Sequence, residues 1–241
     1  MSSLVIPTRA IALGLLKAGT LSLRDVDGGE EPYLYSSGNN GPGYVMVKSL
    51  GGCKPVFRQA CIWLAAKVAA EHPQLDWVAA NATGGMPPGV LVSEYLEHFL
   101  GKTIPYVYIR GTRKRGGHGE LITNLPNNPD TPSGSSAVVM EELVNFASTT
   151  CNSAVLLREE GYRADHACCI LYYGNPEAEK ALQRDQVGMT YLLTLSTLLE
   201  VAEEEGTHPA ALVQKYREFL ANPLKWQSDR GFEPRKEGGT L

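Results

Sequence analysis

Hydrophobic and polar residues follow two rhythms along this chain. In several segments, apolar positions repeat every three or four residues, which is the spacing of one buried helix face. Short, nearly continuous apolar runs lie between these segments and are typical of buried strands. The helices predicted in this way cover residues 7–18, 53–71, 89–100, a segment ending at 160, 191–204 and 209–220. The predicted strands cover residues 77–80, 105–109, 137–140 and 166–173, after two β-like runs at 33–36 and 44–48.

The order of these elements indicates the fold class. From residue 77 onward, strands alternate with helices, which predicts an α/β domain with a mainly parallel sheet and helices on both faces. We expect one large domain over residues 1–205, followed by a C-terminal helix and polar tail over residues 206–241. Residues 222–241 are polar and are expected to be loosely held.

Composition narrows the class of protein. The 241 residues suffice for one large α/β domain, or for one domain with a small appendage. A net charge of −4 argues against a broad nucleic-acid-binding surface. The five cysteines have neither disulfide-type nor zinc-type spacing, so we interpret them as buried free thiols in a reducing compartment. We find no signal-peptide pattern and no apolar stretch of the roughly 18 residues that a membrane span needs. These features predict a soluble, cytoplasmic protein without a membrane partner.

Four loops are expected at the carboxyl ends of the strands, where open parallel sheets bind their ligands. The first contains Thr83, Gly84 and Gly85 ahead of a predicted helix. Two glycines allow a turn whose backbone N–H groups converge on an anion. A plain tight turn is the alternative, because a short glycine pair is a weak signal.

The second loop, residues 110–119, is strongly basic. Its candidate residues are Arg110, Arg113, Lys114, Arg115 and His118. A cationic lid suits a phosphorylated substrate, because it can close over the site and neutralise developing charge. The alternative is a basic loop that is merely solvated. Because the segment is rich in glycine and has no apolar anchor, we expect it to be mobile without ligand.

The third loop begins with an acidic pair, Glu141 and Glu142, directly after the predicted strand at 137–140. Two adjacent carboxylates can bind sugar hydroxyls or the water shell of Mg²⁺, although charged residues after a buried strand are common. Further hydrogen-bonding groups follow at Asn145, Ala147, Ser148 and Thr149. They could bind a phosphate or simply cap the next helix.

The fourth loop lies between the two β-like runs and offers Ser37, Gly38 and Tyr44. Aromatic rings beside polar groups and flexible backbone suit a planar base. A hairpin loop with ordinary core tyrosines is the alternative.

The histidines outside the basic loop carry no metal-binding pattern. His72, His98, His166 and His208 lack ligand-like spacing. We interpret them as surface residues or as structural residues with satisfied hydrogen bonds.

The order of the motifs resembles the orotate phosphoribosyltransferase family over roughly residues 5–205. The resembling segments are residues 33–38, 42–44, 82–87, 106–110 with Lys114 and His118-Gly119, 138–142, 157–161 and 193–199. Each motif alone is weak, but the same motifs in the same order are fairly specific.

This resemblance implies a fold and an activity. The fold would be that of type I phosphoribosyltransferases, with a small N-terminal hood and C-terminal helices beside the sheet. The activity would transfer a phosphoribosyl group from phosphoribosyl pyrophosphate to a pyrimidine base, converting orotate into orotidine 5'-phosphate. The resemblance further implies Mg²⁺ held through pyrophosphate and water, with no direct protein ligand, and a homodimer whose mobile loops reach over the partner's sites.

Site roles follow from the same resemblance. The catalytic candidates are Arg110, Arg113, Lys114, Arg115, His118 and Glu142. The substrate-binding candidates are Ser37, Gly38, Tyr44, Thr83, Gly84, Gly85, Glu141, Asn145, Ala147, Ser148 and Thr149.

Four features differ from the family's pattern. Glu142 replaces an aspartate, residues 145–149 lack the family's glycines, and Tyr172-Tyr173-Gly174 replaces an aspartate-arginine pair whose arginine faces orotate. The family's lysine before the serine-glycine pair is replaced by Tyr35 or Ser36. Two hypotheses therefore remain: an orotate-type enzyme, or a non-catalytic relative with a binding, regulatory or assembly role.

Overall fold

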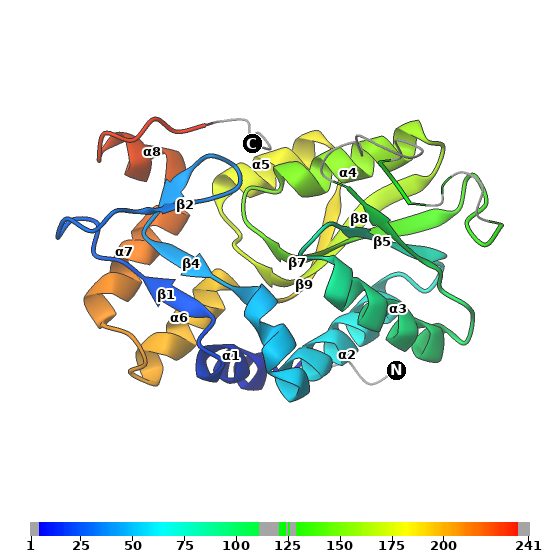
Figure 1. Ribbon diagram of the computed structural model, residues 1–241, viewed down its shortest axis with the longest axis horizontal. Helices are drawn as coiled ribbons and strands as arrows, with labels where there is room; N and C mark the ends of the chain where they lie inside the picture. The colour runs from blue at the N-terminus through cyan, green and yellow to red at the C-terminus, as the bar shows by residue number, and fades with distance from the viewer. Residues whose placement is uncertain (1–4, 111–120, 124, 126–128, 236–241) are drawn as a thin grey trace.

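A five-stranded parallel sheet forms the centre of the molecule (Figure 1). The computed structural model describes residues 5–110, 121–123, 125 and 129–235. In spatial order, the strands are β6 (Tyr106–Ile109), β5 (Trp77–Asn81), β7 (Ser136–Val144), β8 (Arg163–Tyr172) and β9 (Gly188–Thr194). Every residue of β5 is buried, because helices cover both faces of the sheet.

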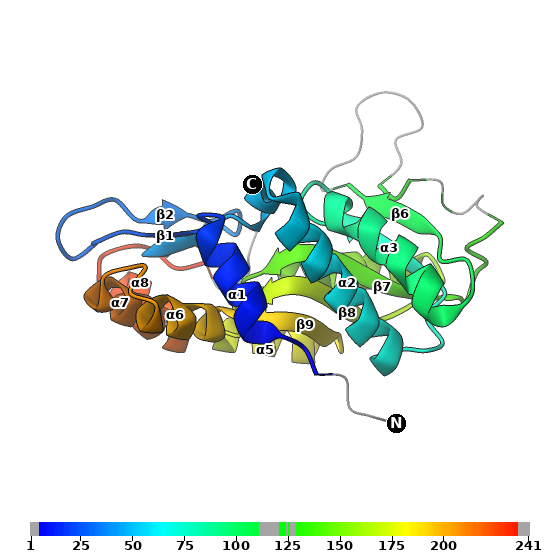
Figure 2. The same cartoon turned by 90° about the horizontal axis from the view of Figure 1, so that it is seen from below.

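Two groups of helices cover the sheet. On one face, α1 (Thr8–Lys17), α2 (Lys54–Glu71) and α3 (Met86–Leu100) pack in front of the strands (Figure 2). The opposite face is covered by α4 (Ser148–Glu159) and α5 (Pro176–Arg184). This layering confirms the predicted α/β class with a mainly parallel sheet.

A small hood lies beside the sheet and contains two antiparallel strand pairs. The first joins β1 (Leu21–Leu23) to β4 (Gly43–Val45), and the second joins β2 (Tyr33–Leu34) to β3 (Asn40–Gly41). A 3₁₀ helix, η1 (Val47–Gly52), connects the hood to α2. The chain ends next to the hood with α6 (Leu195–Glu204), α7 (Ala210–Ala221) and α8 (Pro223–Ser228).

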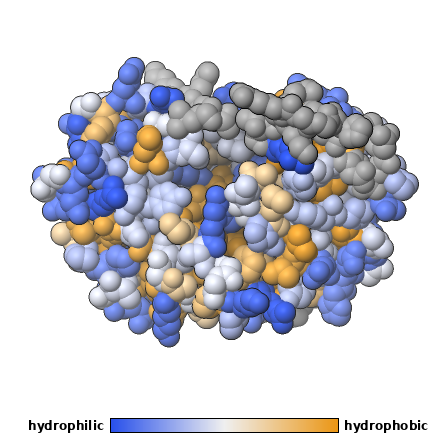
Figure 3. Space-filling view, in the orientation of Figure 1, coloured by the Kyte–Doolittle hydropathy of each residue, from blue (hydrophilic) through white to orange (hydrophobic). Residues whose placement is uncertain are grey.

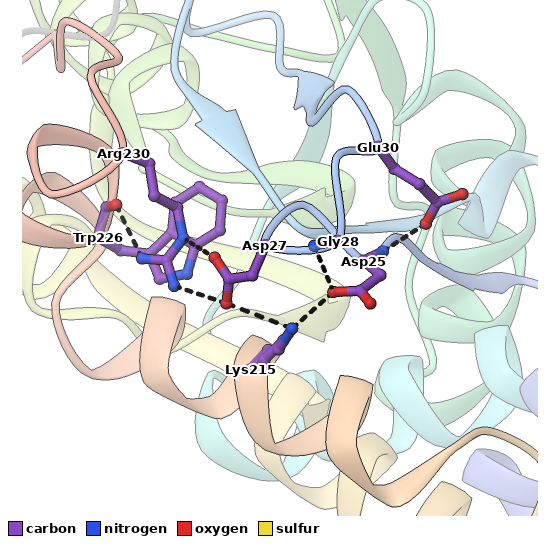
Figure 4. Close-up of polar contacts among 7 residues, drawn as sticks. All are labelled: Asp25, Asp27, Gly28, Glu30, Lys215, Trp226 and Arg230. Carbon is purple, nitrogen blue, oxygen red and sulfur yellow. Dashed lines mark hydrogen bonds and ion pairs between the residues drawn. The ribbon is translucent and has the colours of Figure 1, made fainter.

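The C-terminal helices hold the hood by apolar packing and by ion pairs. Lys215 of α7 contacts Asp25 at 2.6 Å and Asp27 at 3.3 Å, and Arg230 contacts Asp27 at 2.8 Å (Figure 4). Trp226 of α8 is buried, and its ring meets Phe219 edge-on at 5.5 Å. The expectation that the chain is loosely held from residue 222 onward is therefore wrong for the residues of α8. The domain division at residue 205 stays a prediction.

Further element boundaries differ from the sequence-based predictions. Glu141 and Glu142 lie within β7, which continues to Val144 and does not stop before the carboxylates. Residues 191–194 complete the strand β9, and the helix begins only at Leu195. A short apolar run of leucines fits either structure, and here pairing with β8 decides in favour of the strand.

Four of the five cysteines agree with the expectation of buried free thiols. All five cysteines are free, and Cys61, Cys151, Cys168 and Cys169 are buried. None of the helices in the described ranges is long and apolar enough to cross a membrane.

The packing of α8 generates a stability prediction. Trp226→Ala removes a large side chain that is only 4% exposed, and we expect it to lower the free energy of unfolding by about 3–5 kcal/mol. The neighbouring Lys225→Ala is the control, since it removes only an exposed ion pair with Asp229 and is expected to cost under about 1 kcal/mol. Urea unfolding measures both, and equal effects of the two variants would contradict this role for Trp226.

Candidate functional site

A cavity of about 460 Å³ lies where the carboxyl ends of β5 and β7 meet the hood. Its walls come from the hood, the loop after β5 and the segment from Glu141 to Thr150, with Tyr173 after β8. In the space-filling view, the middle of the visible face is hollowed, with apolar groups in its depth and polar groups at its rim (Figure 3). The cavity thus lies at the edge of the sheet where ligands of open parallel sheets bind.

Glu141 is the most deeply buried acid of this cavity. Its side chain is 8% exposed and accepts a hydrogen bond of 2.6 Å from Nδ2 of Asn81, at the end of β5. Oγ of Ser153 in α4 donates to Asn81 at 2.6 Å and so holds the amide in place. Burial, followed by the nearby charge of Glu142, raises the pKa of Glu141 to about 8. The carboxyl group therefore resists ionisation until a ligand supplies hydrogen bonds or positive charge.

Glu142 faces the loop after β5 and the only cation among the described residues that line the cavity. Its Oε1 lies 3.7 Å from Nζ of Lys48. Burial raises the pKa of Glu142, while Lys48 opposes that effect. The two neighbouring carboxyl groups are thus only partly compensated by protein groups, which favours a ligand that brings hydroxyl donors or a hydrated cation.

The two glycines after β5 let the loop approach the acidic pair closely. A Cβ atom at Gly84 would overlap the Glu142 carboxylate, and one at Gly85 would overlap the backbone oxygen of Met140. The peptide bond between Ala82 and Thr83 is cis. Close packing against β7 is therefore one physical reason for glycine at both positions.

The start of α4 forms the opposite wall of the cavity. Ala147 precedes the helix with φ of 60°, in the left-handed region that glycine usually occupies, and no side chain caps this end. The first backbone N–H groups of the helix, at Ser148 and Thr149, consequently have no intrahelical acceptor. Together with the positive end of the helix dipole, they give this wall a positive partial charge without a glycine in the turn.

Tyrosines line the hood side of the cavity. The ring of Tyr44 stacks on that of Tyr35 with centroids 6.5 Å apart, and Tyr173 meets Tyr35 edge-on at 6.4 Å. The Tyr35 hydroxyl donates to the Gly43 carbonyl at 2.6 Å, and the Tyr216 hydroxyl donates to that of Tyr173 at 2.9 Å. Planar surfaces with their own hydroxyls already hydrogen-bonded are suited to contact a planar ligand.

The C-terminal segment fixes the hood loop next to this wall. The buried Asn39 accepts hydrogen bonds from Nε2 of Gln227 at 3.0 Å and from the backbone N–H of Arg235 at 2.9 Å. Gly38, with φ of 78°, lies against the side chain of Arg235, whose Cδ would be 2.7 Å from an added Cβ. This packing leaves Ser37 on the cavity side of the loop.

The structure brings most of the predicted site residues together. The cavity is lined by Ser37, Tyr44, Thr83, Gly84, Glu141, Glu142, Asn145, Ala147, Ser148 and Thr149. Three predicted residues do not line it: Gly38 packs under Arg235, Gly85 supports the turn, and Arg110 donates to the Tyr108 hydroxyl at 2.8 Å. Arg113, Lys114, Arg115 and His118 lie outside the described residues.

Sequence reasoning overlooked two side chains of the cavity and one cluster elsewhere. Lys48 was predicted only as part of a β-like run, and Tyr173 only as a strand residue and a departure from the family's aspartate-arginine pair, although both line the cavity. His72 and His166 were interpreted as surface or satisfied residues, yet their rings lie 3.8 Å apart. No sequence spacing could reveal that contact, because it depends on how α2 packs on β8.

Comparisons with known proteins point to one family, although no protein-family model matches the chain. An orotate phosphoribosyltransferase of Bacillus caldolyticus is 29% identical over 221 residues, which cover 90% of this chain and 98% of that protein. One from Agrobacterium fabrum is 29% identical over 205 residues, 84% of each protein. The crystal structure of orotate phosphoribosyltransferase from Aeropyrum pernix has a TM-score of 0.61 at 25% identity and covers 83% of this chain and 99% of that one. The predicted resemblance and the type I phosphoribosyltransferase fold are thereby confirmed.

The raised pKa of Glu141 generates a pH prediction. In the unfolded chain, Glu141 has the ordinary pKa of 4.5 and is ionised above that pH. In the folded protein, it keeps its proton up to about pH 8. The folded state therefore binds more protons than the unfolded state in this range, and stability falls as the pH rises from about 4.5 to 8. Glu141→Gln removes this pH dependence. We expect the effect of the substitution on the free energy of unfolding to be about 2–4 kcal/mol more stabilising at pH 9 than at pH 4.5.

Urea unfolding at the two pH values, without divalent cations, tests this expectation. Glu94→Gln, on the exposed surface of α3, is the matched control and is expected to behave like the wild type. A Glu141→Gln variant whose stability falls with pH as steeply as that of the wild type would show that Glu141 ionises normally.

Proposed function

We propose that this chain, a divergent relative of the orotate phosphoribosyltransferases, transfers a 5-phosphoribosyl group from phosphoribosyl pyrophosphate to the pyrimidine base orotate. In this reaction a ring nitrogen of the base forms a bond to the anomeric carbon as the bond from that carbon to pyrophosphate breaks. The observation that carries the proposal is the assembly of an acidic pair with a buried Glu141, a glycine turn and a helix N-terminus around one cavity. Catalysis of this kind depends mainly on positioning and on stabilisation of charge.

Each wall of the cavity has a part in the proposed reaction. The N–H groups at the start of α4, near Ser148 and Thr149, would bind the 5-phosphate, as anions bind at helix N-termini. Glu141 and Glu142 would accept hydrogen bonds from the ribose hydroxyls. These hydroxyls would replace the water molecules that the two carboxyl groups lose through burial. The backbone turn at Thr83 would bind pyrophosphate, opposite the acidic pair.

The base would lie against the tyrosine wall. Tyr44 and Tyr173 present ring surfaces to the cavity, and Ser37 adds a hydroxyl at the loop. Residues 110–118 would close over the departing pyrophosphate with Arg110, Arg113, Lys114, Arg115 and His118. Water exclusion by such a lid strengthens every charge interaction inside the site.

Magnesium is the proposed cofactor. The hard carboxylate oxygens of Glu141 and Glu142 suit its hydration shell, and the partly compensated acidic pair fits a nearby hydrated cation. These residues would position the ion through water, while pyrophosphate provides the direct ligands. When bound, Mg²⁺ neutralises charge on the leaving pyrophosphate. We also propose a cytoplasmic location, because buried free thiols persist in a reducing compartment.

Binding and turnover of the substrates test the proposed function. Calorimetry with phosphoribosyl pyrophosphate and Mg²⁺ is expected to give micromolar binding, and added orotate is expected to yield orotidine 5'-phosphate. No binding at millimolar phosphoribosyl pyrophosphate would contradict the proposal and favour a non-catalytic relative.

A double substitution tests the acidic pair. Glu141→Gln with Glu142→Gln keeps shape but removes charge, and we expect turnover to fall on the order of a hundredfold. The melting temperature at pH 8 is not expected to fall, because the change removes buried acids rather than packing. Glu94→Gln is again the control. Normal turnover with a lower melting temperature would identify the two carboxylates as structural.

We propose a homodimer in which the basic segment of one subunit reaches the site of the other. Light scattering at tens of micromolar is expected to give the mass of two chains. Lys114→Ala is expected to reduce turnover, and mixing it with the Glu141→Gln, Glu142→Gln protein is expected to restore activity, because mixed dimers combine one intact site with an intact lid. A monomeric mass, or no gain of activity on mixing, would contradict this arrangement.

A further inference from the structure

A second polar cluster lies near the amino ends of the strands, away from the catalytic cavity. Glu71 is the last residue of α2 and His72 follows it, while His166 lies early in β8, opposite Val138 and Gly188 of the neighbouring strands. The ligand atoms of Glu71, His72 and His166 all lie within 4.8 Å of one another. Residues from a helix end and a strand thus converge on one point.

The imidazole of His72 has an unsatisfied nitrogen at this point. Its Nε2 is buried and has no hydrogen-bond partner among the described residues. A buried polar nitrogen without a partner is uncommon and costs free energy, typically about 1–3 kcal/mol. A ligand that binds this nitrogen would remove that cost.

Glu71 and His166 are linked by one hydroxyl group. Thr190 in β9 donates a hydrogen bond to Oε2 of Glu71, and its Oγ1 lies 3.0 Å from Nε2 of His166. The two groups are therefore already held near each other, next to the unpartnered nitrogen of His72. Nζ of Lys67 lies 3.9 Å from Oε1, the other oxygen of Glu71. At this distance Lys67 balances the negative charge of Glu71 only in part.

The placement of the two imidazoles also suits a metal ion. Their ring centroids lie 3.8 Å apart, and an imidazole nitrogen that carries no proton can coordinate a metal ion. The carbonyl end of α2 adds a negative partial charge beside them.

We propose that Glu71, His72 and His166 form a binding site for a divalent transition-metal ion of the Zn²⁺ class. Two imidazole nitrogens and one carboxylate oxygen are a known Zn²⁺ donor set, with a fourth position left for water. The same nitrogens select against Mg²⁺, which prefers oxygen ligands. The site is separate from the proposed catalytic function and does not rest on it.

Closure of the site needs only small movements. Ligand atoms of tetrahedral Zn²⁺ lie roughly 3.4 Å apart, given bonds of about 2.0–2.1 Å. The Glu71 side chain is 42% exposed and can rotate towards the imidazoles. A bound ion would join the end of α2 to β8 and stabilise the folded state by mass action.

Zinc titration of the chelator-treated, full-length protein tests this proposal. Calorimetry is expected to give one Zn²⁺ per chain with micromolar or tighter affinity and a raised melting temperature. His72→Gln and Glu71→Gln are each expected to weaken binding at least about tenfold. The control His98→Gln, on the exposed surface of α3, is expected to keep the wild-type affinity. Co²⁺ provides a spectroscopic check, because nitrogen ligation changes its visible absorption.

Two results would overturn the site. One is the absence of stoichiometric Zn²⁺ binding by the wild type at tens of micromolar. The other is binding that persists unchanged in both His72→Gln and Glu71→Gln, since the ion would then lie elsewhere, for example at Cys53 or at the acidic pair. Both variants change partly exposed residues at a helix end, so folding can be verified by their melting temperatures. Failure of this test leaves the proposed transferase reaction untouched, because the measurements use no substrate.

Discussion

A buried carboxyl group inside a parallel sheet constrains the candidate site. An acid in an apolar strand is costly unless hydrogen bonds or cations compensate it. Here Asn81, itself held by Ser153, provides one hydrogen bond to Glu141, so that β5, β7 and α4 meet at a single group. Gly84 leaves the space that the neighbouring Glu142 needs. The compensation remains incomplete, as the raised pKa shows, and a ligand with hydroxyl groups or a hydrated cation would complete it. A bound substrate would thereby offset the free-energy cost of burying these carboxyl groups.

The other half of the cavity depends on the end of the chain. The strand pairs of the hood contain only two or three residues in each strand, too few to be stable by themselves. They are held by Tyr216 and Trp226, which belong to the same apolar core as Tyr35 and Val45, and by the amide of Gln227, which fixes Asn39. The tyrosine wall therefore combines Tyr35 and Tyr44 of the hood with Tyr173 after β8, and it is supported by residues from the last quarter of the sequence. A change in α8 would reach the tyrosine wall through this packing, although α8 contributes no residue that lines the cavity among those described.

The sequence predicts the layers of the fold well, because nearly continuous apolar runs mark the buried strands β5, β7 and β8, and helical segments alternate with them. Most of the site was also predictable, since parallel strands place their carboxyl ends at one edge and the motifs follow those ends. The extent of β7 was not predictable, because Glu141 and Glu142 look like the charged end of a strand, whereas the strand continues through them. The strand β9 was taken for a helix since leucines suit either structure. The cluster of His72 and His166 was beyond reach for a different reason: tertiary packing alone brings the two side chains together.

The two edges of the sheet differ in the kind of ion that they favour. In a fold where helices run antiparallel to the strands, helix N-termini gather at the carboxyl edge and helix C-termini at the amino edge. The former carry a positive partial charge and the latter a negative one. The uncapped start of α4 accordingly faces the cavity, where phosphate groups would bind, while the end of α2 lies beside Glu71 and His72. Ligand chemistry reinforces this separation, since carboxylates near water favour Mg²⁺ and neutral imidazoles favour Zn²⁺. A transition metal at the amino edge and a magnesium-bound substrate at the carboxyl edge would thus occupy one molecule without competing for the same ligands.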